Sequence, residues 1–296
     1  MVRTRVVSSQ RRSLNAFEHR AGIALPHVAP FFSSSSLFHL YLEISTHGPL
    51  VMKITIVGSG DAFGTDGRAH TCFRIDACGV TTVVDFGAGS IIAWKKLGFS
   101  CNDIDNVVIS HLHGDHFGGL PFLLLDSQFA ARREKPLRLI GPPGLRERLH
   151  GVLDAFYPGM GAAGWNFDLM IEEHPVPRSS MVGDLSLQTF EVLHLPNAAG
   201  IRLSDGRRTF AYSGDTAWTD KLFEIAAQAD LFIVECYSGG ENVPNHMVWP
   251  KLAAHLPGLT AKRIVVTHLG ESALARRAEM EARGLTIAHD GQIFDL

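Results

Sequence analysis

Three histidines and one aspartate fall within six positions of the segment VVISHLHGDHFGGL, residues 107–120. These side chains are His111, His113, Asp115 and His116. Neutral imidazole and carboxylate are the ligands that Zn²⁺, Mn²⁺ and Fe²⁺ accept in proteins. A chain with 15 histidines can place two of them together by accident. Four ligating side chains beside glycines, directly after an apolar strand, instead indicate a metal site.

The spacing of these side chains allows them to converge. His111 and His113 are two residues apart, so an extended backbone projects them to the same side. Gly114 permits a sharp turn, which can bring Asp115 and His116 round to the same pocket. The carboxyl end of a strand is also where α/β proteins commonly build their sites.

Three further candidate ligands follow other predicted strands and complete a known pattern. The stretches FEVLHLPNAAGIRL, FAYSGDTAW and RIVVTHLG supply His194, Asp215 and His268. This order of ligands, HxHxDH and then a histidine, an aspartate and a histidine, resembles the ligand pattern of the metallo-β-lactamase superfamily of metallohydrolases. The resemblance runs from about Met52 to the C-terminus. It implies a four-layer αββα sandwich of two mixed β-sheets with outer helices.

The resemblance also implies two divalent metal ions, zinc in the first instance and manganese or iron as alternatives. On one ion it places His111, His113 and His194. On the other it places Asp115, His116 and His268, with Asp215 as the bridge. A water held between two such ions loses a proton near neutral pH, and the resulting hydroxide attacks a carbonyl carbon or phosphorus. Asp115 is placed to orient that nucleophile or to accept its proton.

Asp85 in the stretch VVDFG is a candidate partner for one of the imidazoles. Metal-bound histidines usually donate their second N–H group to a carboxylate or a carbonyl. The alternative is an aspartate that only forms the turn before Gly87.

Within the superfamily, the chain resembles the ribonuclease Z-like branch and its phosphodiesterase relatives. The stretches HLHGDHFGGLPFLL, REKPLRLIGPPGL and AYSGDT carry this likeness. VECYSGGENVPNHMVWPKLAA further resembles the segment in which that branch places a glutamate and a histidine, here Glu235 and His246. The resemblance implies that His246 assists the phosphate, as a donor to the leaving oxygen, and that Glu235 holds it. A strand end and a helix start are the structural alternatives for these two residues.

One departure from the branch concerns the substrate. Its tRNA-processing members carry a long arm between the third histidine and the bridging aspartate. Only 20 residues separate His194 from Asp215, which is enough for a hairpin and no arm. The net charge of −3 also lacks the basic footprint of nucleic-acid-binding proteins. We therefore predict a small phosphodiester or nucleotide as substrate, and disfavour long nucleic acid and tRNA 3′-processing.

Other reactions stay open because one fold hosts many chemistries. They are hydrolysis of a carboxyl ester, lactone or thioester on the same two-metal site, and oxygenation at a single iron.

The composition, 46% hydrophobic and 19% charged, is that of a globular protein with a proper core. Four cysteines without a CxxC pair predict reduced, mostly buried thiols and a cytoplasmic location. No apolar run predicts a membrane span, and a homodimer is compatible with the sequence.

The regular pattern of strands and helices begins at Met52. Residues 1–51 hold five arginines, two acids and a serine tract. We expect them to be disordered or a non-native extension from a start codon assigned too early, with a targeting segment as the alternative. Residues 52–296 are expected to form one metallo-β-lactamase-like hydrolase domain.

The expected elements alternate in a way that fits two sheets covered by helices. Strands are predicted over 53–58, 71–76, 81–87, 106–110, 137–141, 169–174, 185–193, 199–203, 208–213, 231–236, 263–268, 285–288 and 292–295. Helices are predicted over 90–98, 117–131, 143–156, 218–228, 246–255 and 271–284. The stretch GSGDAFG, residues 58–64, predicts a tight turn at the rim of the site, and 157–168 a glycine-rich connection.

Overall fold

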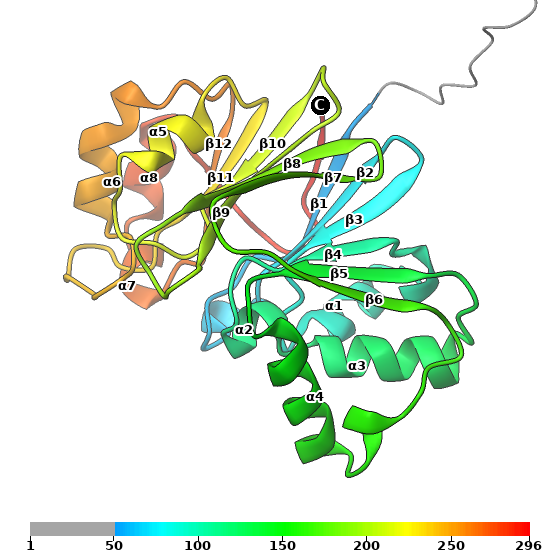
Figure 1. The fold of residues 1–296 in the computed structure, drawn as a ribbon. Coiled ribbons are helices and arrows are strands. Elements are labelled where there is room, and N and C mark those ends of the chain that lie inside the picture. Colours follow the sequence, from blue (N-terminus) through cyan, green and yellow to red (C-terminus); the bar gives the residue numbers. More distant parts are fainter. Residues whose placement is uncertain (1–50) are drawn as a thin grey trace, which may run out of the picture. The chain divides into compact units, whose positions relative to one another are not determined.

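Two mixed β-sheets form the centre of the protein in the computed structural model, which describes residues 51–296 (Figure 1). In spatial order the first sheet contains β14 (Ile293–Asp295), β1 (Lys53–Gly58), β2 (Cys72–Ala77), β3 (Val80–Val84), β4 (Asn106–Val108), β5 (Leu137–Gly141) and β6 (Leu169–Glu173). The second contains β13 (Thr286–Ile287), β12 (Ile264–Thr267), β11 (Leu231–Glu235), β10 (Thr209–Tyr212), β9 (Ala199–Ser204), β8 (Leu185–Glu191) and β7 (Arg178–Val182). Apart from Val51, the predictions for residues 1–51 lie outside the described residues.

Helices cover the outer face of each sheet (Figure 1). On the side of the first sheet lie α1 (Ser90–Lys96), α2 (Gly114–Phe117), α3 (Leu120–Leu125) and α4 (Leu145–Phe156). On the side of the second lie α5 (Lys221–Ala226), α6 (Trp249–His255), α7 (Glu271–Leu274) and α8 (Arg277–Ala282). None of the helices in residues 51–296 has the length and apolar character needed to cross a membrane.

Three apolar cores hold these four layers together. Between the sheets, Phe73 of β2 packs edge-on against Tyr212 of β10, with ring centroids 5.0 Å apart. A second core joins the first sheet to its helices, and a third joins the second sheet to its own. Neighbouring residues of one strand belong to different cores, because Val107 faces the helices and Val108 faces the other sheet. Strands buried on both faces read as continuous apolar runs. The predicted αββα sandwich is therefore confirmed.

The strand β7 was not predicted. Its sequence, RSSMV, is largely polar, and it pairs only with β8 at the edge of the second sheet. An edge strand with an exposed face carries no apolar pattern that would reveal it.

Several predicted helices have different limits in the structure. The helix predicted over 143–156 begins only at Leu145, because Gly144 has a φ of 91°. The helix predicted over 271–284 is divided into α7 and α8, since Arg276 has a non-helical ψ of 5°. The apolar helix predicted over 117–131 consists of the end of α2, then α3 and a π-helical turn. The helix predicted over 246–255 begins at Trp249, so residue 246 belongs to a loop.

We predict that one thiol of the folded protein reacts rapidly with an aromatic disulfide reagent. Cys78 is exposed, whereas Cys72, Cys101 and Cys236 are buried. Burial blocks access to these three thiols and raises their pKa, which lowers the population of the reactive thiolate. Absorbance should report one fast thiol in buffer and all four in denaturant, with the fast phase lost in Cys78→Ser. A second fast thiol in the native protein would contradict the described packing.

Candidate metal centre

The predicted metal ligands follow the ends of four strands and form two groups. His111, His113 and His194, after β4 and β8, have ligand atoms within 4.8 Å of one another. Asp115, His116, Asp215 and His268, after β4, β10 and β12, meet the same limit. The structure thus brings together all seven residues, in the two groups that the resemblance implied. That they bind metal ions stays a prediction at this stage.

The HxHxDH turn forms where an extended strand end changes into a short helix. His113 has extended backbone angles, with φ −80° and ψ 153°, and α2 begins at the next residue. Gly114 has no positive φ, and a side chain there would meet nothing within 4 Å. The sharp turn is present, but it does not use the conformational freedom of a glycine at position 114.

The close approach that shapes the turn occurs at Gly87 instead. A Cβ atom built on Gly87 would lie 2.1 Å from the carbonyl oxygen of Asp115 and 2.5 Å from Cβ of His70. Backbone hydrogen bonds join the same segments, from Phe86 N to the carbonyl of His116 and from Ala88 N to that of Gly114. The backbone of the loop after β3 therefore packs directly against the backbone of the ligand turn and is hydrogen-bonded to it.

Asp85 orients His116, as the sequence predicted. Its Oδ2 lies 2.7 Å from Nδ1 of His116. The carboxylate also accepts hydrogen bonds from the backbone N–H and the hydroxyl of Ser110, both at 2.7 Å. In the neutral imidazole, donation from Nδ1 to this carboxylate leaves the lone pair of His116 on Nε2, directed at the cluster.

A backbone carbonyl gives His194 the same kind of support. Nδ1 of His194 lies 3.0 Å from the carbonyl oxygen of Asn245, which can only accept a hydrogen bond. Nε2 therefore carries the lone pair, and it lies 3.0 Å from Nδ1 of His113. Asn245 itself has a left-handed backbone conformation, with a φ of 65°. Sequence reasoning missed this contact, because a backbone acceptor leaves no signature in residue type.

Three polar atoms of the ligand residues have no hydrogen-bond partner. Among residues 51–296, Nε2 of His111, Nε2 of His116 and Oδ1 of Asp215 are buried without a hydrogen-bond partner. Nε2 of His116 lies 3.2 Å from Oδ2 of Asp215. Buried polar atoms are normally paired, and a shared cation would satisfy these acceptors together. The donor set, imidazole nitrogen with carboxylate oxygen, therefore fits divalent metal ions.

Buried carboxylates favour positive charge in the cluster and shift the pKa values of its histidines. Burial lowers the pKa of His268, but the charge of Asp215 and a hydrogen bond to Asp115 outweigh it and raise that pKa to about 9. Burial likewise opposes protonation of His116, and nearby carboxylates again raise its pKa. Burial raises the pKa of Asp115, but the interactions of its carboxylate with His116 and His268 outweigh burial and lower that pKa.

Glu235 and His246 lie beside the ligand cluster as a hydrogen-bonded pair. Nδ1 of His246 lies 3.1 Å from Oε1 of Glu235, which is fully buried at the end of β11. Glu235 also accepts a hydrogen bond from the backbone N–H of Thr216. The His246 side chain is 21% exposed, so it faces the solvent side of the cluster. His246 also lies within 4.8 Å of ligand atoms of His194 and Asp215, a proximity that the sequence did not predict.

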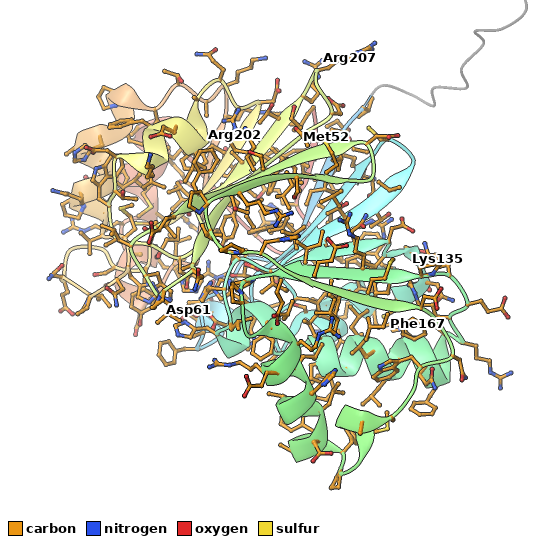
Figure 2. The ribbon with its side chains drawn as sticks, viewed as in Figure 1. Met52, Asp61, Lys135, Phe167, Arg202 and Arg207 are labelled. Atoms are coloured by element: carbon orange, nitrogen blue, oxygen red, sulfur yellow. The ribbon has the colours of Figure 1, made fainter. Side chains whose placement is uncertain are left out.

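Between His194 and Asp215 the chain forms the predicted hairpin. Strands β9 and β10 pair antiparallel from Ile201 and Tyr212 up to Ser204 and Thr209. His194 precedes β9 and Asp215 follows β10, so the turn of the hairpin, where Figure 2 labels Arg207, lies at the opposite end of the strands from these two ligands. The hairpin therefore extends away from the site and does not form an arm over it.

We predict that Gly87→Ala weakens metal binding strongly, because the new Cβ must displace the backbone of the ligand turn at Asp115. Gly89→Ala is the matched control, since a Cβ there has its nearest neighbour at 3.6 Å. Zinc affinity measured by competition with a chromophoric chelator should fall at least about tenfold for the first variant only. Equal affinities for both variants would contradict the described contact.

Metal affinity should rise with pH beyond the range in which ordinary histidines titrate. Ligands bind metal in their unprotonated form, so an ion must displace the protons that the carboxylates hold on His116 and His268. With the pKa of His268 near 9, the apparent zinc dissociation constant should fall about tenfold per pH unit for each proton released. Chelator competition at pH 6, 7 and 8 measures this slope. A constant affinity between pH 7 and 8 would contradict the prediction.

The chain is similar to several curated proteins. It is 32% identical over 145 residues to the ribonuclease Z of Lachnoclostridium phytofermentans, a match that covers 49% of this chain and 45% of that protein. It is 28% identical over 239 residues to the uncharacterized protein Rv1339 of Mycobacterium tuberculosis, covering 75% of this chain and 83% of that protein. The chain thus spans less than half the length of the ribonuclease Z proteins that it matches first.

Solved structures show the same fold at lower identity. The metallo-β-lactamase fold protein YhfI from Bacillus subtilis superposes with a TM-score of 0.67 at 20% identity, over 83% of this chain and all of that one. The short form of human tRNase Z gives 0.68 at 21% identity, over 82% and 98%. Zn²⁺-bound PqqB from Methylobacterium extorquens gives 0.66 at 18% identity, over 83% and 100%.

A family model described as "Anti-Pycsar protein Apyc1" matches residues 52–294, which include every predicted ligand and the pair Glu235 and His246. The predicted metallo-β-lactamase fold and the likeness to the ribonuclease Z-like branch are confirmed by these comparisons. The chain belongs to the Anti-Pycsar protein Apyc1 family.

Proposed function

We propose that this protein is a hydrolase with two divalent metal ions, preferably zinc, that cleaves a small phosphodiester or nucleotide. The observation that carries the proposal is the pair Glu235 and His246 beside the two ligand groups. A carbonyl-directed hydrolase needs the metal ligands but has no evident use for a histidine held beside them by a buried glutamate. Similarity to proteins named ribonuclease Z supports phosphoester chemistry.

The residues that would hold the ions are those of the two groups. One ion would be held by His111, His113 and His194, and the other by Asp115, His116 and His268, with Asp215 between them. Such ions supply Lewis acidity and lower the pKa of a water molecule toward neutrality. The protein supplies the fixed orientation of each imidazole, through Asp85 for His116 and through the Asn245 carbonyl for His194.

Two residues would move protons during the reaction. The carboxylate of Asp115 faces the cluster and is 8% exposed, which places it to orient the attacking water or accept its proton. Glu235 occupies Nδ1 of His246, so Nε2 is the nitrogen available to the substrate. Burial lowers the pKa of His246, but the hydrogen bond to Glu235 outweighs it and raises that pKa. His246 would therefore donate a proton or hydrogen bond to the leaving oxygen.

The substrate would be small because nothing extends over the site from the β9–β10 hairpin. Its strands end in a four-residue turn on the side away from the ligand cluster. This favours a cyclic nucleotide or another short phosphoester over tRNA.

We predict that His246→Ala lowers turnover of a phosphodiester by about 10² to 10⁴-fold, the usual contribution of a positioned acid. The metal-loaded protein would be assayed on an aryl phosphodiester, a cyclic nucleotide, a lactone and a thioester. Metal content by plasma emission should stay near two ions per chain in the variant, which separates a proton donor from a lost ligand. His255→Ala is the control, because His255 stacks on Trp218 and belongs to none of the ligand groups.

Two outcomes would overturn the proposal. One is a protein that binds two ions and turns over no phosphoester. The other is lactone or thioester turnover that His246→Ala leaves intact, which would identify a carbonyl-directed hydrolase. One equivalent of iron together with oxygen uptake would identify an oxygenase instead.

A further inference from the structure

The two predicted ligand groups differ in their access to solvent. In the first group His111 is buried, but His113 and His194 are partly exposed. The second group is buried throughout, and each of its members is at most 8% exposed: Asp115, His116, Asp215 and His268. An ion can therefore reach the first group directly from solution. The second group requires an access path through other side chains of the protein.

A further set of candidate ligands adjoins the buried group. Ligand atoms of Glu235, His246 and His268 lie within 4.8 Å of one another, and we call these three residues the outer group. Nδ1 of His246 and Oε1 of Glu235 are 3.1 Å apart. Two ligand atoms bound to one tetrahedral zinc ion are separated by a similar distance, roughly 3.3 Å. The outer group therefore has the donor atoms and the spacing to hold a divalent ion.

His268 belongs to both groups and has a ring nitrogen without a partner. Its Nε2 lies 3.2 Å from Oδ2 of Asp115, a member of the second group. Its Nδ1 is buried and has no hydrogen-bond partner within residues 51–296. Buried polar atoms are normally paired, so the protein leaves one nitrogen of this ring unsatisfied beside two sets of metal-ligating atoms.

The outer group lies between solvent and the second group. The side chain of His246 is 21% exposed, whereas Glu235 and His268 are buried. Two overlaps connect His246 to the second group. The outer group shares His268 with it, and a set formed by His194, Asp215 and His246 shares Asp215. An ion bound at His246 can therefore gain a ligand of the second group before it loses its own.

The distribution of charge favours movement of the ion inward. The outer group contains one carboxylate, Glu235, whereas the second group contains two, Asp115 and Asp215. The second group also offers four ligands and the outer group three. Attraction between a divalent ion and carboxylates is strong where water is excluded. The outer group is therefore expected to hold an ion only until the second group takes it up.

We propose that Glu235, His246 and His268 form a loading site, which binds a divalent metal ion from solution and passes it to the buried second group. The inference rests on the two metal ions of the proposed function and adds the route by which one of them is acquired. Once the ion has moved on, the hydrogen bond between His246 and Glu235 forms again. His246 then occupies the position that the proposed function requires.

The test follows zinc uptake by the metal-free full chain after rapid mixing with zinc and a chromophoric chelator. We expect a fast phase for the first group and a slow phase for the second, with one ion in each. His116→Ala removes a ligand of the second group and should abolish the slow phase, which identifies it. His246→Ala should slow that phase at least about tenfold, about 1.4 kcal/mol in its barrier, and leave the fast phase unchanged. Its final content should still be two ions per chain.

Two further variants serve as controls. His246→Phe keeps an aromatic ring but has no ligand atom, so it should slow the second phase as His246→Ala does. His255→Ala should leave both phases unchanged, because His255 belongs to none of the ligand groups. This comparison separates the loss of a metal ligand from the loss of a ring or of any histidine.

Three results would overturn the loading site. They are an unchanged slow phase in both His246 variants, a faster one in His246→Ala, which would mean that the ring only obstructs the path, and a final content below two ions. Failure of the proposed function has a different signature. In that case phosphodiesters are not turned over, while two ions still bind and the slow phase still depends on His246.

Discussion

The burial of several carboxylates in one place is the constraint on which the site depends. Asp85, Asp115, Asp215 and Glu235 are each at most 8% exposed, and all lie among histidine rings. Buried carboxylates are costly unless positive charge or hydrogen-bond donors compensate them. The charge of these carboxylates outweighs burial and raises the pKa of both His116 and His268, which favours positive charge on these histidines. Divalent ions can supply the same charge, which links the electrostatics of the fold directly to metal binding.

The sandwich brings these groups together because each sheet contributes part of the cluster. The HxHxDH turn and Asp85 follow strands of the first sheet, whereas His194, Asp215 and His268 follow strands of the second. Packing of Phe73 against Tyr212 belongs to the core that joins the sheets beneath the site. Neither sheet alone could complete a ligand group, so the inter-sheet core is also what assembles the candidate metal centre.

Two loops add contacts that the strand ends do not provide. The loop after β11 presents the Asn245 carbonyl to His194 and places His246 against Glu235. The loop after β1 is fastened around His268 and presents Phe63 to solvent. Each loop is thus held against a residue of the ligand cluster, His194 in one case and His268 in the other.

The sequence by itself determined the types and order of the ligands, the candidate pair Glu235 and His246, and the apolar strands of the sandwich. Ligand chemistry and burial on both faces leave direct marks in residue type and periodicity. Only the tertiary structure decided that Gly87 supports the turn and Gly114 does not, and that β7 exists. It also supplied the Asn245 contact, which joins residues 51 positions apart. Such contacts arise from the packing of distant segments, and local sequence carries no record of that packing.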